Sequence, residues 1–327
     1  MRSYQSKIRI EKDASVPETR KHIPFLILCV ITLLIILPYI LGVNVPVWFE
    51  LSVFAFFVII TGIPHGAVDH IVAAGVYNLE QTKKDRIRFY GIYLITMLAL
   101  GVVWILSPIL GFAIFIVISV YHFGQGDLSW LTGSMSRTAS TLLYTSRGLF
   151  LIGLPVLLHA DITFPIIEAA VRRDLGDVGL LIRYGGVLSG LLVIQHLFFL
   201  FFIPKTAPGT VFKEFILVIL LGLLFYAAHP LVSFGVYFGL WHSLNHFYEL
   251  RDHLKEGNQS FRFFSLYKKT IPFTLISFAG LAILWLIQGA IGIENQMISL
   301  LFILISVLTL PHMLLIDRMY RKGHQPN

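Results

Sequence analysis

The stretch LVSFGVYFGLWHSLNHF, residues 231–247, decides the fold, because it is apolar and free of charged side chains, yet carries two histidines. A helix needs about 17–25 predominantly apolar residues to cross a bilayer. Nine further segments of this kind lie at 25–43, 47–63, 89–106, 108–123, 139–158, 179–203, 211–228, 271–291 and 297–316. We therefore predict an all-α, polytopic transmembrane helical bundle of about ten spans, or eight to ten because several segments are short or tightly joined.

The composition excludes an ordinary soluble protein. Of the 327 residues, 56% are hydrophobic and 13% are charged, whereas a soluble domain averages about 25% charged residues. The net charge of +7 comes from short clusters between the apolar runs, and no basic stripe interleaved with aromatics suggests nucleic-acid binding. The single cysteine, Cys29, excludes a disulfide within the chain and a cysteine-based metal site.

Lysines and arginines predict how the chain is oriented, because cytoplasmic loops are enriched in them. The predicted outer loops at 43–47, 106–108, 229–230 and 292–296 contain neither residue. We expect a cytoplasmic tail at 1–24, a single transmembrane domain with the functional site at 25–317, and a cytoplasmic tail at 318–327. The loop at 159–178 breaks the pattern with Arg172 and Arg173, and there we expect an interfacial helix.

Four histidines lie near the same end of their spans under this topology. They are His65 in GIPHGAVDH, His122 in YHFGQGD, and His242 and His246 in WHSLNHFYEL. His242 and His246 are spaced i, i+4, so both rings fall on one helix face. Neutral imidazole is a common ligand of iron, zinc and copper, and polar rings inside a membrane are costly unless they bind something. We predict that these four histidines form one metal site near the cytoplasmic side.

The residues around these histidines suggest groups that orient the rings. A carboxylate follows each one, and a metal-bound imidazole usually donates its other N–H to such a group. The candidates are Asp69, Asp127, Glu249 and, after His312, Asp317; spacing does not assign the pairs, and interfacial charge is the alternative for each. His312 is a candidate fifth ligand, orienting group or pocket residue, and His70 lies on the same side.

Four further expectations concern the surroundings of the site. Pro64 and Gly66 beside His65, and Gly124 after His122, predict that both helices break at the histidine. Tyr121 and Trp241 each precede a candidate ligand and are candidate contacts for a long apolar substrate. His196 lies mid-span, where we expect a hydrogen bond to another helix.

The motifs GIPHGAVDH, YHFGQGD, WHSLNH and, more loosely, LPHMLLID at 310–317 resemble the Brp/Blh family of bacterial and archaeal membrane β-carotene 15,15′-dioxygenases. The resemblance covers about 62–317. It implies O₂-dependent cleavage of the central double bond of β-carotene to two molecules of retinal in the inner membrane. It also implies a non-haem Fe(II) held by His65, His122, His242 and His246, with no side-chain acid or base. An opsin is a candidate recipient of the retinal.

Other functions stay open at this stage. A di-iron carotenoid hydroxylase, ketolase or desaturase would need about eight histidines in several boxes, including an HxxHH that is missing here. A b-type cytochrome would leave the clustering of four histidines unexplained. An opsin needs a lysine within a span, whereas the lysines here lie in loops or tails. A non-enzymatic transporter would show broken spans in corresponding halves, which the sequence does not.

Overall fold

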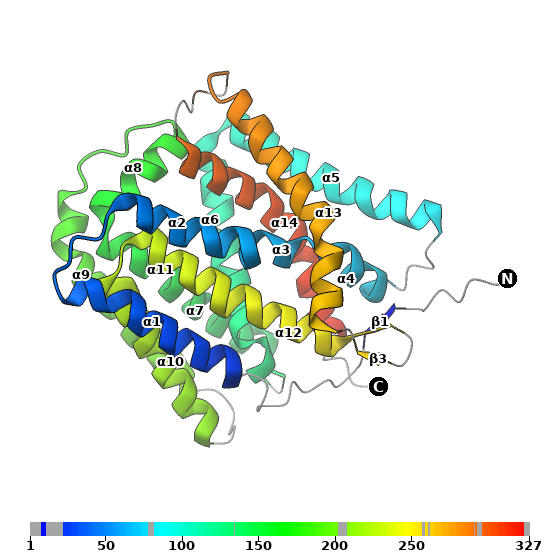
Figure 1. The fold of residues 1–327 in the computed structure, drawn as a ribbon, viewed down its shortest axis with the longest axis horizontal. Helices are drawn as coiled ribbons and strands as arrows, with labels where there is room; N and C mark the ends of the chain where they lie inside the picture. The colour runs from blue at the N-terminus through cyan, green and yellow to red at the C-terminus, as the bar shows by residue number, and fades with distance from the viewer. Residues whose placement is uncertain are drawn as a thin grey trace. The chain divides into compact units, whose positions relative to one another are not determined.

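The computed structural model describes residues 8–10, 22–77, 82–133, 135–201, 208–256, 259–260, 262–290, 292 and 296–323. Helices dominate this part of the chain (Figure 1). The first half contains α1 (His22–Ile40), α2 (Val47–Phe57), η2 (Val58–Gly62), α3 (Ile63–Gly66), α4 (Asp69–Val76), α5 (Lys83–Leu106), α6 (Pro108–Leu128), η3 (Ser129–Leu131) and α7 (Arg137–Leu158). The second half contains α8 (Ala160–Val171), α9 (Gly179–Leu200), α10 (Pro208–Ala227), α11 (Pro230–Val236), η4 (Tyr237–Ser243), α12 (Leu244–His253), α13 (Phe263–Leu286) and α14 (Met297–Gly323).

Local sequence explains where several helices begin and end. The Thr82 side chain accepts the backbone N–H of Asp85 at the start of α5, and Ser136 does the same for Ala139 at the start of α7. A side-chain hydroxyl at this position accepts from one of the first backbone N–H groups, which have no acceptor within the helix. Arg172 ends α8 with a φ of 53°, in the left-handed region that glycine usually occupies there.

The chain divides into two compact units, each built from separate stretches of sequence. Unit 1 comprises Met1–Pro17, Ile63–Phe115 and Asn245–Asn327, and unit 2 comprises Glu18–Gly62 and Ile116–Leu244. The single domain predicted for 25–317 stays a prediction.

Unit 1 is organised around α14, which packs against α4, α5 and α13 (Figure 1). Its core includes Val68, Val72, Phe247, Leu266 and Ile316, all essentially inaccessible to solvent. Trp104 on α5 donates its indole N–H to Ser306 on α14 at 2.8 Å, which satisfies both polar groups between apolar helices.

A small antiparallel sheet also belongs to unit 1 and was not predicted from the sequence. Its strand order is β1 (Ile8–Ile10), β2 (Leu254–Glu256) and β3 (Gln259–Ser260), and Arg9 is paired with Lys255. Strand β1 therefore lies within the predicted N-terminal tail, and α14 continues into the predicted C-terminal tail. Of the two tails, residues 1–7, 11–21 and 324–327 lie outside the described part of the chain.

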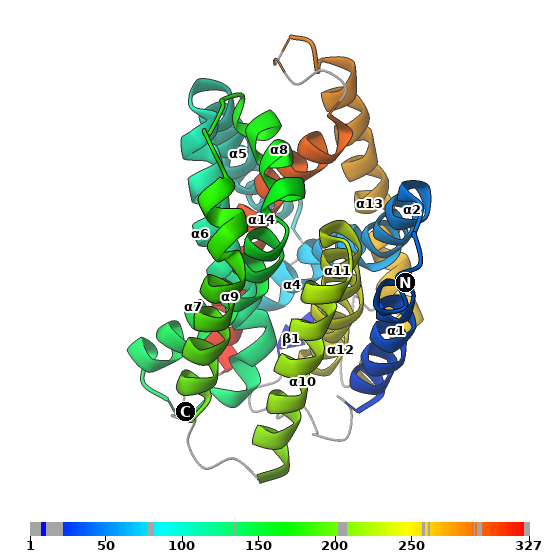
Figure 2. The ribbon, with the colours of Figure 1, turned by 90° about the vertical axis from the view of Figure 1, so that its left-hand side faces the viewer.

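Unit 2 is built on close helix pairs, chiefly α7 along α9 (Figure 2) and α2 against α11. Glycines set the spacing between α6 and α7. A Cβ added at Gly124 would lie 1.8 Å from the Tyr144 carbonyl oxygen, and one at Gly148 would lie 1.8 Å from that of Val120. Small residues permit this close approach of backbones, which is typical of helix packing in membranes.

Each of the ten segments predicted as spans contains a helix among its described residues. Among the described residues, seven helical stretches are long and apolar enough to cross a membrane: 47–76, 83–106, 108–131, 137–158, 179–200, 263–286 and 297–321, with Pro24–Ile40 as a shorter apolar helix. The loop at 159–178 contains a helix as predicted, namely α8. A count of eight to ten spans and the cytoplasmic location of both termini stay predictions.

Candidate metal centre

Two segments with π-helical turns lead into the predicted histidine motifs. In η2 the turn ends at Gly62, just before Pro64 and His65, while η4 contains His242. Pro64 has no N–H to donate to the carbonyl four residues earlier, which disfavours a regular α-helix there. π-helical turns are often found at functional sites, so these distortions mark both segments as unusual spans.

The two distorted turns pack against each other within unit 2. A Cβ at Gly62 would lie 2.6 Å from Cε1 of Phe238, and one at Gly239 would lie 2.8 Å from both Cβ of Phe57 and Oγ1 of Thr61. Side chains larger than glycine would push the segments apart. The glycines therefore fix the start of the motif that leads to His65 and the turn that carries His242.

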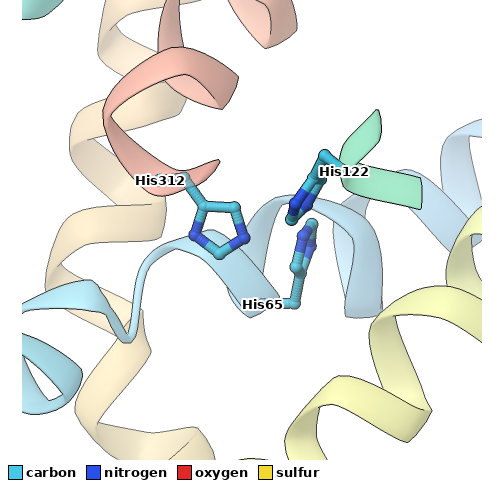
Figure 3. A group of neighbouring side chains, drawn as sticks. All are labelled: His65, His122 and His312. Atoms are coloured by element: carbon cyan, nitrogen blue, oxygen red, sulfur yellow. The ribbon is translucent and has the colours of Figure 1, made fainter. Parts of the chain in front are cut away.

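Three buried histidines form a cluster within unit 1. His65 comes from α3, His246 from α12 and His312 from α14. Their ring centres lie 5.7 Å apart for His65–His246, 5.1 Å for His65–His312 and 5.5 Å for His246–His312, with interplanar angles of 88°, 89° and 81°. Figure 3 shows the His65 and His312 rings beside each other, and each offers a ligand nitrogen within 4.8 Å of the other.

These separations can be compared with those of rings on one metal ion. A metal–nitrogen bond of about 2.1 Å places imidazole centres roughly 4.6–5.3 Å apart for ligands at octahedral to tetrahedral angles. The His65–His312 distance of 5.1 Å falls in this range, and these two rings offer ligand nitrogens within 4.8 Å of each other. Neutral nitrogen donors with no thiolate suit iron, zinc or copper. His65 and His312 of unit 1 thus fit two ligands of one metal ion.

An aspartate orients one ring of this unit 1 histidine cluster. His312 Nδ1 lies 2.7 Å from Oδ1 of Asp69, and the Tyr93 hydroxyl donates to Oδ2 of Asp69 at 2.8 Å. An ionised carboxylate can only accept hydrogen bonds, so the Nδ1–H of His312 donates this hydrogen bond to Asp69. The sequence named Asp69 as an orienting group without assigning its partner, and the structure pairs it with His312.

Unit 2 holds the other two predicted ligands. The rings of His122 on α6 and His242 in η4 are buried, with centres 5.2 Å apart and an interplanar angle of 78°. Figure 3 also draws His122, which belongs to this unit. Phe123 lies edge-on to His242 at 4.6 Å, and Phe238 is stacked against it at 5.9 Å. A Cβ at Gly126 would lie 2.9 Å from Cε1 of His242, so this glycine leaves room for the ring.

The predicted helix break at His122 is wrong. The residue lies inside α6, which continues to Leu128. The glycine that follows, Gly124, serves the close contact with α7 described above rather than a turn. The break after His65 is confirmed, since α3 ends at Gly66 and α4 begins at Asp69.

A buried ion network in unit 2 was missed by the sequence analysis. Arg147 on α7 has no exposed surface, and its Nε donates to Asp127 at 3.0 Å while Nη2 lies 3.5 Å from Glu214. Its Nη1 lies 3.2 Å from Nε2 of His196, whose Nδ1 lies 2.9 Å from the Ser146 hydroxyl. The expected hydrogen bond from His196 to another helix is confirmed. An arginine inside the apolar run 139–158 was the signal that could have revealed the network.

The remaining predicted residues have other partners. Asp127 lies 3.9 Å from Nδ1 of His242 and accepts a hydrogen bond from the Tyr237 hydroxyl at 3.4 Å. Glu249 accepts from the Tyr320 hydroxyl at 2.7 Å, and Asp317 pairs with Arg321 on its own helix.

The aromatic side chains predicted to contact the substrate differ in their surroundings. The Tyr121 hydroxyl accepts from Gln125 at 3.2 Å, and Trp241 is buried edge-on to Phe25 at 6.4 Å. His70, by contrast, stacks at a tilt on Phe273 with centres 4.5 Å apart and bonds through Nδ1 to the Ala67 carbonyl at 3.2 Å.

Comparison with known proteins gives a consistent result. The family model described as beta-carotene 15,15′-dioxygenase matches residues 56–320. A relative named beta-carotene 15,15′-dioxygenase, from the uncultured marine bacterium 66A03, is 29% identical over 279 residues, covering 81% of this chain and 92% of the relative. A Halobacterium salinarum protein named probable beta-carotene 15,15′-dioxygenase Blh is 24% identical over 323 residues, covering 87% and 88%. No solved structure matches the chain significantly.

Proposed function

The chain belongs to the beta-carotene 15,15′-dioxygenase family, and from this membership we propose that it is an integral membrane enzyme that cleaves β-carotene. The substrate is split by O₂ at the central 15,15′ double bond. Both bonds between the two central carbons break, each carbon gains one oxygen atom, and two molecules of all-trans-retinal result. O₂ is the oxidant and supplies both carbonyl oxygens, so no further reductant is needed.

The observation that carries this proposal is the extent of the family match. It spans 56–320 and so includes every histidine of both buried groups, not one motif alone. Family membership supports the reaction, and the buried imidazoles support a metal-dependent form of it. Seven apolar helices support a location in a membrane, where the substrate, a long hydrocarbon, would dissolve.

We assign the cofactor as Fe(II), bound by His65, His122, His242 and His246. Nitrogen-only donor sets without thiolate suit iron, and within unit 1 the rings of His65 and His246 are neighbours, with centres 5.7 Å apart. The iron would supply the site at which O₂ is activated.

The protein's own contribution is to bind the metal ion, to orient the substrate and to exclude water. The histidines would hold the ion, the glycines at 62, 126 and 239 keep the ligand-bearing segments close, and apolar side chains would exclude water from the reaction. No side chain needs to move a proton to or from the polyene. Tyr121 and Trp241 remain the proposed contacts for the substrate, and the ion is proposed to lie toward the cytoplasmic side of the inner membrane, with an opsin as a candidate recipient of retinal.

The test is pigment analysis of β-carotene-producing cells that express the chain. We expect cells with the wild type to lose β-carotene and form retinal. Cells with His65→Ala or His242→Ala should keep their β-carotene and form no retinal. His159→Ala is the control, because that ring bonds the Phe225 carbonyl at 2.8 Å, apart from both histidine groups. Unchanged β-carotene in cells with verified expression and sufficient iron would refute the proposal. An oxygenated or desaturated C40 product would indicate a di-iron oxidase instead.

A further inference from the structure

We infer that His312 is itself a metal ligand, that Asp69 is its positioning residue, and that unit 1 therefore binds the ion through three imidazoles. This inference rests on the proposed iron site and extends it, because the four-histidine set does not include His312. Its observations lie entirely within unit 1.

The first observation is the geometry of the unit 1 histidine cluster. Each of the three rings is nearly perpendicular to the other two, and all three pairs of centres lie between 5.1 and 5.7 Å. A buried imidazole needs polar partners for its ring nitrogens, and here each ring has the other two as neighbours. Three rings at these separations lie within reach of one shared metal ion, and His65 and His312 offer ligand nitrogens within 4.8 Å of each other.

The second observation is the hydrogen bond that fixes the tautomer of His312. Because Asp69 accepts at 2.7 Å from Nδ1, the lone pair of the ring lies on Nε2. A carboxylate that holds the distal N–H of a metal-bound histidine is the usual arrangement in metalloproteins, and it raises the basicity of the ligand. The Tyr93 hydroxyl holds the second carboxylate oxygen, so Asp69 itself is fixed.

The third observation is the rigidity of the frame. Asp69 starts α4, four residues after His65, so one short segment carries both a ligand and the group that orients another ligand. Helices α4 and α14 meet in the unit 1 core, where Val68 and Val72 pack in the same cluster as Leu315 and Ile316. These contacts place the helix that carries His312 against the segment that carries Asp69.

The alternative is that the His312–Asp69 hydrogen bond serves only to stabilise the fold. Measuring metal affinity distinguishes this structural role from a ligand role. The probe is Co(II), added to metal-free, detergent-solubilised full-length protein, because its visible absorption depends on the number and kind of ligands. Binding constants and spectra are compared for the wild type, His312→Gln, Asp69→Asn and the control His70→Gln. His70 is a suitable control because it lies next to Asp69 but its ring contacts Phe273.

We expect His312→Gln to change the Co(II) spectrum and weaken binding at least about tenfold, and Asp69→Asn to weaken it roughly 10–100-fold. His70→Gln should match the wild type. Wild-type affinity and spectrum in His312→Gln would overturn the inference. If that variant is not monodisperse, Asp69→Asn decides, since Asp and Asn have the same shape, and unchanged binding there overturns it equally.

The retinal assay keeps this inference separate from the proposed function. A wild type that makes retinal, with Co(II) binding unaffected by His312→Gln, would refute the ligand role and leave the function standing. A wild type that makes no retinal, but whose Co(II) site depends on His312, would refute the proposed function and leave the ligand role standing.

Discussion

Replacing Gly124 by alanine should destabilise the protein, because the glycine lies where α6 and α7 touch backbone to backbone. The added Cβ would lie 1.8 Å from the Tyr144 carbonyl oxygen, whereas carbon and oxygen normally approach to about 3.3 Å. The helices must separate by roughly 1.5 Å at this point, and a backbone carbonyl cannot rotate out of the way. Overpacking of this kind costs about 1–3 kcal/mol, against a gain of up to ~1 kcal/mol in helix propensity.

Thermal unfolding of the detergent-solubilised protein, followed by tryptophan fluorescence, measures the effect. We expect the Tm of Gly124→Ala to fall by roughly 2–4 °C per kcal/mol of net destabilisation. Gly190→Ala is the matched control, since this helical glycine of unit 2 has nothing within 4 Å of an added Cβ, and its Tm should stay the same or rise. An unchanged Tm for Gly124→Ala, or equal losses in both variants, would refute the reasoning.

Three further changes should have distinct effects on stability. Arg147→Met leaves two buried carboxylates without their cation, so we expect a loss of about 3–5 kcal/mol, measured as a large fall in Tm or in monodisperse yield; wild-type stability would contradict this. Trp104→Phe removes the hydrogen bond to Ser306 and should cost about 1 kcal/mol, so a Tm no lower than that of the wild type would argue against it. Arg172→Gly relieves a left-handed backbone conformation and should stabilise by about 0.5–1 kcal/mol, with a lower Tm as the opposing result.

Much of the fold follows from the sequence, because long apolar runs in a chain with few charges have few structural solutions. Each of the ten segments predicted as spans contains a helix in the described part of the chain, and the helix in the loop at 159–178 was expected. The strands were not predicted, since β1 lies in a polar tail and pairs with residues more than 240 positions later. The π-helical turns were also missed, because hydrophobic periodicity does not register one extra residue in a helix.

The histidines of the candidate site could be picked out from the sequence, but their pairing could not. Spacing along the chain left the partner of Asp69 unassigned, and only folding, which brings α4 against α14, pairs Asp69 with His312. A pairing over 243 positions depends on tertiary packing that single-sequence patterns do not contain. The ion network of Arg147 was missed for a related reason. The sequence shows an arginine inside the run 139–158, but only the folded unit shows the two carboxylates that compensate its charge.

The central claim is that this chain splits β-carotene into retinal with O₂ and iron, and the direct measurement uses the purified protein. Metal-free protein in detergent is given β-carotene and O₂, with and without Fe(II), and products are quantified by chromatography. We predict two molecules of retinal for each β-carotene consumed, and none when either Fe(II) or O₂ is left out. Retinal formed equally well without iron, or β-carotene left intact by the iron-loaded, monodisperse protein, would contradict the account.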